Sequence, residues 1–140
     1  MRTARTLAAT LIEARVFWQL CLGLLLLSVG FLALHPTPPA AISSGWDKLN
    51  HVLAFAALSW SGYLGLAASS RRTWPMIVGL LAFGALIELA QLIIPGRAGE
   101  WADLLADAIG TACGSSLAML FYHGSRGRGI VPQRLEAKTP

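Results

Sequence analysis

Hydrophobic residues are concentrated in four long runs, which are separated by shorter polar stretches. The runs cover residues 16–34, 49–68, 74–94 and 102–121. A helix of about 20 mostly apolar residues crosses the roughly 30 Å hydrocarbon core of a bilayer. The pattern therefore predicts an all-α fold, an integral membrane bundle of four transmembrane helices. The fourth run is the weakest candidate, because it contains two acidic residues.

The residues around the runs are polar or break helices. Pro75 is predicted to lie in the first turn of the third helix, and Pro95-Gly96 to end that helix. The first run is longer than the roughly 7–15 apolar residues of a signal peptide, and no small-residue cleavage site follows it. We expect residues 1–15 to form a cytoplasmic basic amphipathic segment and residues 122–140 a cytoplasmic polar tail.

The composition agrees with a membrane protein. Only 13% of the 140 residues are charged and 55% are hydrophobic, whereas roughly 25% of a soluble domain is charged. Such a chain is too apolar to be disordered and argues against a water-soluble globule. Two cysteines exclude a disulfide-rich scaffold. The chain has a net charge of +4. In an apolar chain, an excess of basic residues is typical of the cytoplasmic loops of a membrane protein, so no nucleic-acid partner is inferred from it.

The basic residues predict the orientation of the bundle. With four spans both termini lie on one side, and placing them in the cytoplasm puts nine basic residues inside and two outside. The inner group consists of Arg2, Arg5, Arg15, Arg71, Arg72, Arg126, Arg128, Arg134 and Lys138, and the outer pair is Lys48 and Arg97. Because cytoplasmic loops are enriched in Lys and Arg, we predict an N-in/C-in protein of the inner membrane.

Ionisable residues gather at the outer ends of three helices. Asp47 and His51 are four residues apart, so they share one helix face. Glu88 and Gln91 are three apart near the end of the next helix. Arg97, in the following short connection, is expected to reach Asp103 or Glu88. Buried acids in a membrane are costly, so these side chains should face the bundle interior and find partners.

The fourth helix adds a mixed acidic and small-residue face. Asp103, Asp107, Gly110 and Gly114 are spaced so that they lie along one side of the helix. Gly110 and Gly114 are separated by three residues, a spacing that permits close helix packing. The acids should therefore point toward a neighbouring helix. We predict that His51, Glu88 and Asp107 converge on one interior volume.

These residues, in this order and spacing, resemble the VanZ-like family of small bacterial integral membrane proteins. The resemblance covers residues 46–116 and includes Asp47-Lys48-x-x-His51, Phe55, Glu88-x-x-Gln91 and Arg97, followed by Asp103-x-x-x-Asp107-x-x-Gly110-x-x-x-Gly114. It implies a protein of the cytoplasmic membrane. The family takes its name from a member linked to resistance to the glycopeptide teicoplanin, but the resemblance supplies no biochemical activity. One departure is Asp107, where we expect Asn in many members.

Four interpretations of the outer polar cluster remain open. Its members are Asp47, Lys48, His51, Glu88, Gln91, Arg97, Asp103 and Asp107. The cluster is either a structural network between helices or a binding site for an anionic or lipid-linked envelope component, with membrane lipids as the surrounding partners. In the binding interpretation, a divalent cation bridging carboxylates and phosphate would offset the acidic charge. No other cofactor is identified.

The remaining two interpretations assign chemistry or transport. A lipid-modifying enzyme would use His51, Glu88 and Asp107 as candidate catalytic groups and Asp103 with Asp107 as candidate metal ligands. No recognisable nucleophile motif accompanies them. Four helices of this size make a poor pore alone, so a proton or ion conductor would require oligomerisation.

Overall fold

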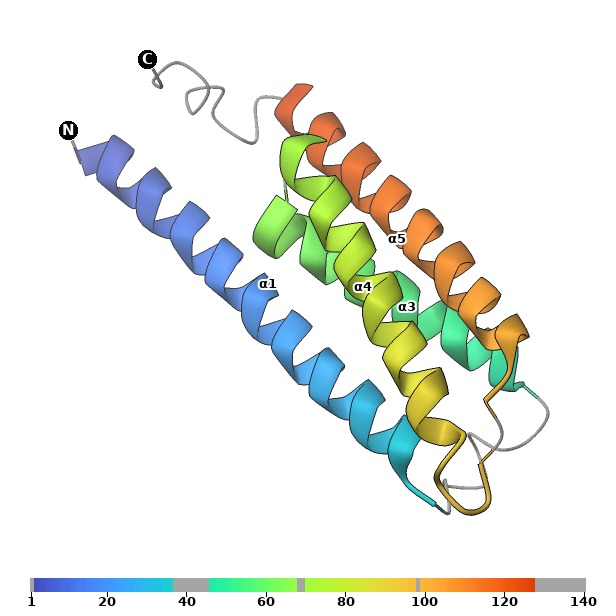
Figure 1. Cartoon of the computed structure of the whole chain (residues 1–140). Helices are drawn as coiled ribbons and strands as arrows, with labels where there is room; N and C mark the ends of the chain where they lie inside the picture. Colours follow the sequence, from blue (N-terminus) through green and yellow to red (C-terminus); the bar gives the residue numbers. More distant parts are fainter. Residues whose placement is uncertain (1, 37–45, 68–69, 98, 128–140) are drawn as a thin grey trace.

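The computed structural model describes residues 2–36, 46–67, 70–97 and 99–127. In this part of the chain all regular structure is helical and no strand is present. The elements are α1 (Arg2–Leu34), α3 (Asp47–Gly62), the π-helix η1 (Tyr63–Ala67), α4 (Ser70–Gln91) and α5 (Trp101–Gly127). Figure 1 shows them as an elongated up-and-down bundle in which α1 lies to one side.

The end of the bundle that carries the ionisable residues is called the polar end. The C-terminus of α1, the start of α3, the end of α4 and the start of α5 all lie there (Figure 1). The opposite end holds η1, the start of α4 and the end of α5. The two most closely associated helices are α3 and α5.

Among the described residues, three helices are long and apolar enough to cross a membrane: Ala14–Leu34, Arg71–Gln91 and Trp101–Gly124. Large apolar side chains cover their outer surfaces, including Leu27 at 74% exposed, Leu86 at 65% and Leu120 at 70%. An exposed apolar surface of this extent is stable in lipid rather than in water. The buried side chains, by contrast, include the polar residues Asp103 and Asp107. The protein is therefore a multi-pass membrane protein.

The second span in the structure differs from the one that the sequence predicted. Residues 49–68 were expected to form one long helix, but α3 has only 16 residues before the helix widens into η1. A 16-residue α-helix is about 24 Å long at 1.5 Å per residue, less than the hydrocarbon thickness. The structure therefore confirms three membrane-capable helices and not the count of four. The fourth predicted run, which was the weakest by composition, qualifies as α5.

The predicted element ends also need correction. α1 is one continuous helix, so residues 2–13 continue it beyond the membrane-capable stretch Ala14–Leu34, and their cytoplasmic location stays a prediction. Pro75 lies inside α4 rather than in its first turn, because α4 begins at Ser70. α4 ends at Gln91, before Pro95. α5 continues to Gly127, beyond the predicted end at residue 121. The rest of the predicted polar tail, residues 128–140, lies outside the described residues.

Candidate functional site

The polar end is centred on a contact between α3 and α5. His51 Nδ1 lies 2.8 Å from Asp107 Oδ1, and the side chains are 15% and 1% exposed. The contact depends on close helix packing, which Gly110 and Gly114 permit. A Cβ on Gly110 would collide with the carbonyl oxygen of Val52, and one on Gly114 with backbone and side-chain atoms of α3. The predicted packing role of both glycines matches this geometry.

A second group of charges surrounds this pair on the solvent side. Lys48 Nζ lies 3.0 Å from a Glu100 carboxylate oxygen and 3.7 Å from Asp103 Oδ1. The hydrogen bond to Glu100, together with the negative charge of Asp103, raises the pKa of Lys48 above its usual range. Asp47 belongs to the same group, because its carboxylate lies close to His51 and Asp103. These contacts hold the start of α3 against the start of α5.

Glu88 lies near the histidine pair but is hydrogen-bonded elsewhere. Its Oε2 accepts a hydrogen bond of 2.8 Å from the backbone N–H of Glu100, and its Oε1 is buried without a hydrogen-bond partner. Glu88 therefore fixes the connection between α4 and α5. Of the three residues expected to converge, His51 and Asp107 are joined, whereas Glu88 forms no hydrogen bond to either.

Arg97 and Gln91 bind the end of α1 instead of the acids. Arg97 Nε donates to the His35 carbonyl at 3.1 Å and Nη2 to the Leu32 carbonyl at 2.6 Å. Gln91 Nε2 donates to the Ala33 carbonyl at 3.0 Å. The expected contact of Arg97 with Asp103 or Glu88 is thus wrong. The last carbonyls of a helix lack intrahelical partners and carry its negative dipole end, which attracts the guanidinium.

A tight turn positions Arg97 for this role. The Arg97 N–H donates to the Ile94 carbonyl at 3.2 Å, and Gly96 between them has a φ of 81°. Pro95 followed by a glycine with positive φ is the pattern of a type II turn. The Pro-Gly pair therefore turns the chain after α4 has ended and directs Arg97 back toward α1.

Several buried oxygens at and below this end have no hydrogen-bond partner in the described part of the chain. They are Glu88 Oε1, Asp103 Oδ1, Asp107 Oδ2, Thr111 Oγ1 and Ser115 Oγ. Four of these five residues are spaced four apart on α5, so they form one polar stripe facing the bundle interior. Buried polar groups are normally hydrogen-bonded, which makes this stripe a candidate position for a bound ligand or ordered water.

Two further residues belong to the site although the sequence did not point to them. Gly84 of α4 leaves room for Asp107, because a Cβ there would collide with Asp107 Oδ2. Glu100 binds both Lys48 and Glu88. Neither residue stands in a motif.

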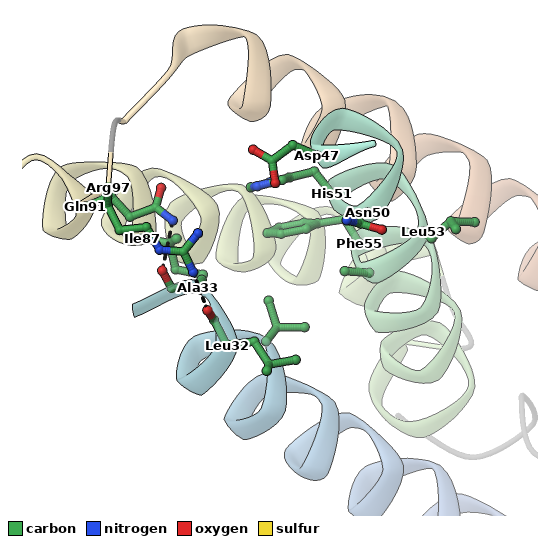
Figure 2. Close-up of a pocket in the computed structure, with 12 residues that line it drawn as sticks. Leu32, Ala33, Asp47, Asn50, His51, Leu53, Phe55, Ile87, Gln91 and Arg97 are labelled. Atoms are coloured by element: carbon green, nitrogen blue, oxygen red, sulfur yellow. Dashed lines mark hydrogen bonds between the residues drawn. The ribbon is translucent and has the colours of Figure 1, made fainter. Parts of the chain in front are cut away.

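A cavity of about 220 Å³ opens beside these residues, between α1, α3 and α4. Figure 2 shows Asp47, His51 and Asn50 on one side of it and Gln91 and Arg97 on the other. Its remaining walls are apolar and include Val29, Leu32, Leu53, Phe55 and Ile87. The cavity therefore combines polar groups with an apolar lining, as an amphiphilic ligand would require.

Arg97 is the main positive charge on the cavity wall. It forms no ion pair with a carboxylate among the described residues, since the ion pairs there involve Lys48 and His51. Its hydrogen bonds go to neutral carbonyls. Its charge is therefore balanced only by a helix dipole and remains available to an anion.

Comparison with known proteins identifies a family for most of the chain. The VanZ/LLP1 family model matches residues 7–122, which span most of α1 and α5 and everything between them. No curated protein and no solved structure matches the chain.

Proposed function

This chain belongs to the VanZ/LLP1 family, and from its geometry we propose that it binds an anionic, lipid-linked component of the cell envelope in the cavity at its polar end. The observation that carries the proposal is Arg97, a cation that has no carboxylate partner among the described residues and lies on the wall of an otherwise largely apolar cavity. A phosphate would contact Arg97 through charge-assisted hydrogen bonds. The attached hydrocarbon would lie along Leu32 and Phe55.

The proposed orientation places this cavity in the outer leaflet of the inner membrane. Four spans, with α3 and η1 together forming the second, would put both termini in the cytoplasm. Arg71 and Arg72 near the start of α4 would then be cytoplasmic, in agreement with the positive-inside rule. Leu53, which lines the cavity, is 59% exposed on the surface of the bundle. A lipid could therefore enter sideways from the bilayer.

Photo-crosslinking tests the proposal. The purified chain in nanodiscs is exposed to photoactivatable polyprenyl phosphate, to photoactivatable phosphatidylglycerol and to the uncharged polyprenol. We expect phosphate-dependent labelling that maps to α1 and α3. Comparing the labelling by polyprenyl phosphate with that by phosphatidylglycerol distinguishes a lipid-linked precursor from a bulk phospholipid. Equal labelling by polyprenol would overturn the role of the phosphate.

Variants separate the cavity arginine from other cations. Arg97→Gln should abolish labelling and Arg97→Lys should retain part of it, because Lys keeps the charge but not the planar donor geometry. Arg72→Gln, an exposed residue at the other end of the bundle, serves as the matched control. Undiminished labelling of Arg97→Gln would contradict phosphate binding by Arg97. Val29→Trp, which fills the cavity without removing a charge, should also reduce labelling.

The His51–Asp107 contact supports a second candidate, an enzyme acting on the same class of lipid. A histidine hydrogen-bonded to a carboxylate at 2.8 Å has the arrangement of a general base oriented by an acid. Turnover of phosphatidylglycerol or polyprenyl phosphate that is lost in His51→Ala would support it. Absence of turnover across a lipid panel would exclude it in favour of binding alone.

Binding of an envelope precursor predicts a cellular phenotype. Sequestering or presenting such a lipid would change the amount available for wall synthesis, so loss or overproduction of the protein should alter susceptibility to glycopeptides such as teicoplanin. Minimum inhibitory concentrations in deletion, wild-type and Arg97→Gln strains test this. Wild-type susceptibility in the Arg97→Gln strain would show that the change in glycopeptide susceptibility does not depend on lipid binding by Arg97.

A further inference from the structure

Three metal-ligating side chains meet where α3 and α5 begin. A carboxylate oxygen of Asp47, a ring nitrogen of His51 and a carboxylate oxygen of Asp103 lie within 4.8 Å of one another. Atoms that bind one ion at about 2.0–2.2 Å lie no more than about 4.4 Å apart. Small side-chain movements would therefore bring all three to a common ion.

The histidine is already held in the manner of a metal ligand. Its Nδ1 lies 2.8 Å from Asp107 Oδ1, so Nε2 is the ring nitrogen that would coordinate a metal. Histidine ligands commonly donate their other ring N–H to a carboxylate, which fixes the tautomer and the ring orientation. Asp107 is 1% exposed and so is held firmly in place. It would act as a positioning residue rather than as a ligand.

A second observation concerns the hydrogen bonding of the Asp103 carboxylate. The Asp103 side chain is 3% exposed, and its Oδ1 has no hydrogen-bond partner in the part of the chain that the structure describes. Lys48 forms an ion pair with that oxygen at 3.7 Å, but the ammonium is shared with Glu100, which it binds at 3.0 Å. A buried carboxylate oxygen without a hydrogen bond is costly, and in a membrane protein the cost is higher still.

We propose that Asp47, His51 and Asp103 bind one divalent transition-metal cation, of the Zn²⁺ or Mn²⁺ type. The imidazole ligand favours these ions over Mg²⁺ and Ca²⁺, which prefer oxygen ligands alone. Three protein ligands leave a coordination position for water or for an oxygen of a bound molecule. Because Asp47 and His51 also line the cavity, the ion would stand at its edge and face a bound phosphate.

Metal binding is tested with the metal alone, so the result is independent of the lipid proposal. The full chain, purified in detergent and stripped with chelator, is titrated calorimetrically with Zn²⁺ or Mn²⁺. Co²⁺ replaces Zn²⁺ for visible absorption spectroscopy, in which the band positions report nitrogen and oxygen coordination. We expect saturation at one ion per chain. Absence of saturable binding at that stoichiometry would overturn the proposal whatever the variants show.

Variants locate the site. His51→Gln and Asp103→Asn should each weaken binding more than about 100-fold, because the loss of a ligand exceeds the roughly 10–100-fold effect of an outer partner. Asp107→Asn keeps an acceptor for His51, so it should fall within that smaller range. His123→Gln, an exposed histidine near the far end of α5, is the matched control and should bind as the wild type does. Wild-type affinity in His51→Gln would place the metal elsewhere and refute the site.

Discussion

His51 of α3 and Asp107 of α5 are joined by a 2.8 Å contact between Nδ1 and Oδ1, deep in the packing of the two helices. The second oxygen of Asp107 has no hydrogen-bond partner and lies against Gly84 of α4. Three helices therefore meet at one carboxylate. Whether this carboxylate serves stability or binding can be measured.

A double-mutant cycle with His51→Ala and Asp107→Ala measures the coupling free energy of the pair. Polar contacts between membrane helices average about 0.6 kcal/mol and reach about 1.7 kcal/mol. We expect a value within this range from unfolding in mixed micelles followed by circular dichroism. The exposed pair Lys48–Glu100 is the control and should couple more weakly and lose its coupling in high salt. A much larger His51–Asp107 value would favour the structural interpretation of the cluster.

Close packing of α3 on α5 should make Gly110 and Gly114 intolerant of side chains. An added Cβ would collide with backbone carbonyls of α3 at both positions, and overpacking of this kind costs about 1–3 kcal/mol. Gly110→Ala and Gly114→Ala should therefore lower the free energy of unfolding by that amount. Gly79→Ala, where no atom lies within 4 Å of the added Cβ, should be neutral or slightly stabilising. Equal stability of the Gly79 and Gly110 variants would contradict close packing.

Gly84→Ala should disturb the histidine without touching it. The added methyl group would collide with Asp107 Oδ2 and lie 3.1 Å from the Phe55 ring, so Asp107 must move away from α4. We expect a changed chemical shift of the His51 ring in selectively labelled protein and a lower thermal stability. Gly79→Ala on the same helix is the control and should leave the His51 signal unchanged. An unaltered signal in Gly84→Ala would show that Asp107 is not confined by α4.

Spacing along single helices predicted much of this site. Four-residue spacing correctly placed Asp47 and His51 on one face of α3, and Asp103 and Asp107 on the packed face of α5. The cost of isolated acids in lipid correctly indicated that Asp103 and Asp107 turn inward, whereas Asp47 is exposed. Periodicity and burial cost depend only on local sequence, which is why they could be inferred.

Partners across helices could not be inferred in the same way. Arg97 was assigned to the acids because opposite charges attract, whereas in the structure the free carbonyls at the end of α1 are within its reach. Gly84 became important only through its position opposite Asp107. The shortening of α3 by η1 likewise has no signal in hydropathy, because the π-helical residues are as apolar as those before them. Contacts of this kind depend on how helices are placed relative to one another.

The π-helix should matter for attachment of α1 at the opposite end of the bundle. The Gly65 carbonyl accepts hydrogen bonds from Arg15 Nε at 2.9 Å and from Gln19 Nε2 at 3.1 Å. A Cβ on Gly65 would lie 3.0 Å from the Gln19 backbone nitrogen. Gly65→Ala should therefore destabilise the protein by about 1–3 kcal/mol, and Gln19→Leu by roughly 0.6 kcal/mol. Gly23→Ala on α1, which has open space, is the control, and unfolding in denaturing detergent is the measurement.

The crossing of the membrane by α3 and η1 can be decided by labelling two positions. The starts of α3 and α4 lie at opposite ends of the bundle (Figure 1), so Trp46 and Arg72 should be on opposite sides of the membrane. In a protein whose Cys21 and Cys113 are replaced by serine, Trp46→Cys should react with an impermeant maleimide in right-side-out vesicles. Arg72→Cys should react only in inverted vesicles.

Both substituted positions are exposed in the structure, so labelling depends on their side of the membrane rather than on burial. Reaction of both variants from the same side would mean that residues 47–67 do not cross, and the protein would then have three spans with its termini on opposite sides. Reaction from opposite sides establishes the fourth crossing. It also assigns the polar end, with His51 and Arg97, to the outer face, because Trp46 marks that end of the bundle.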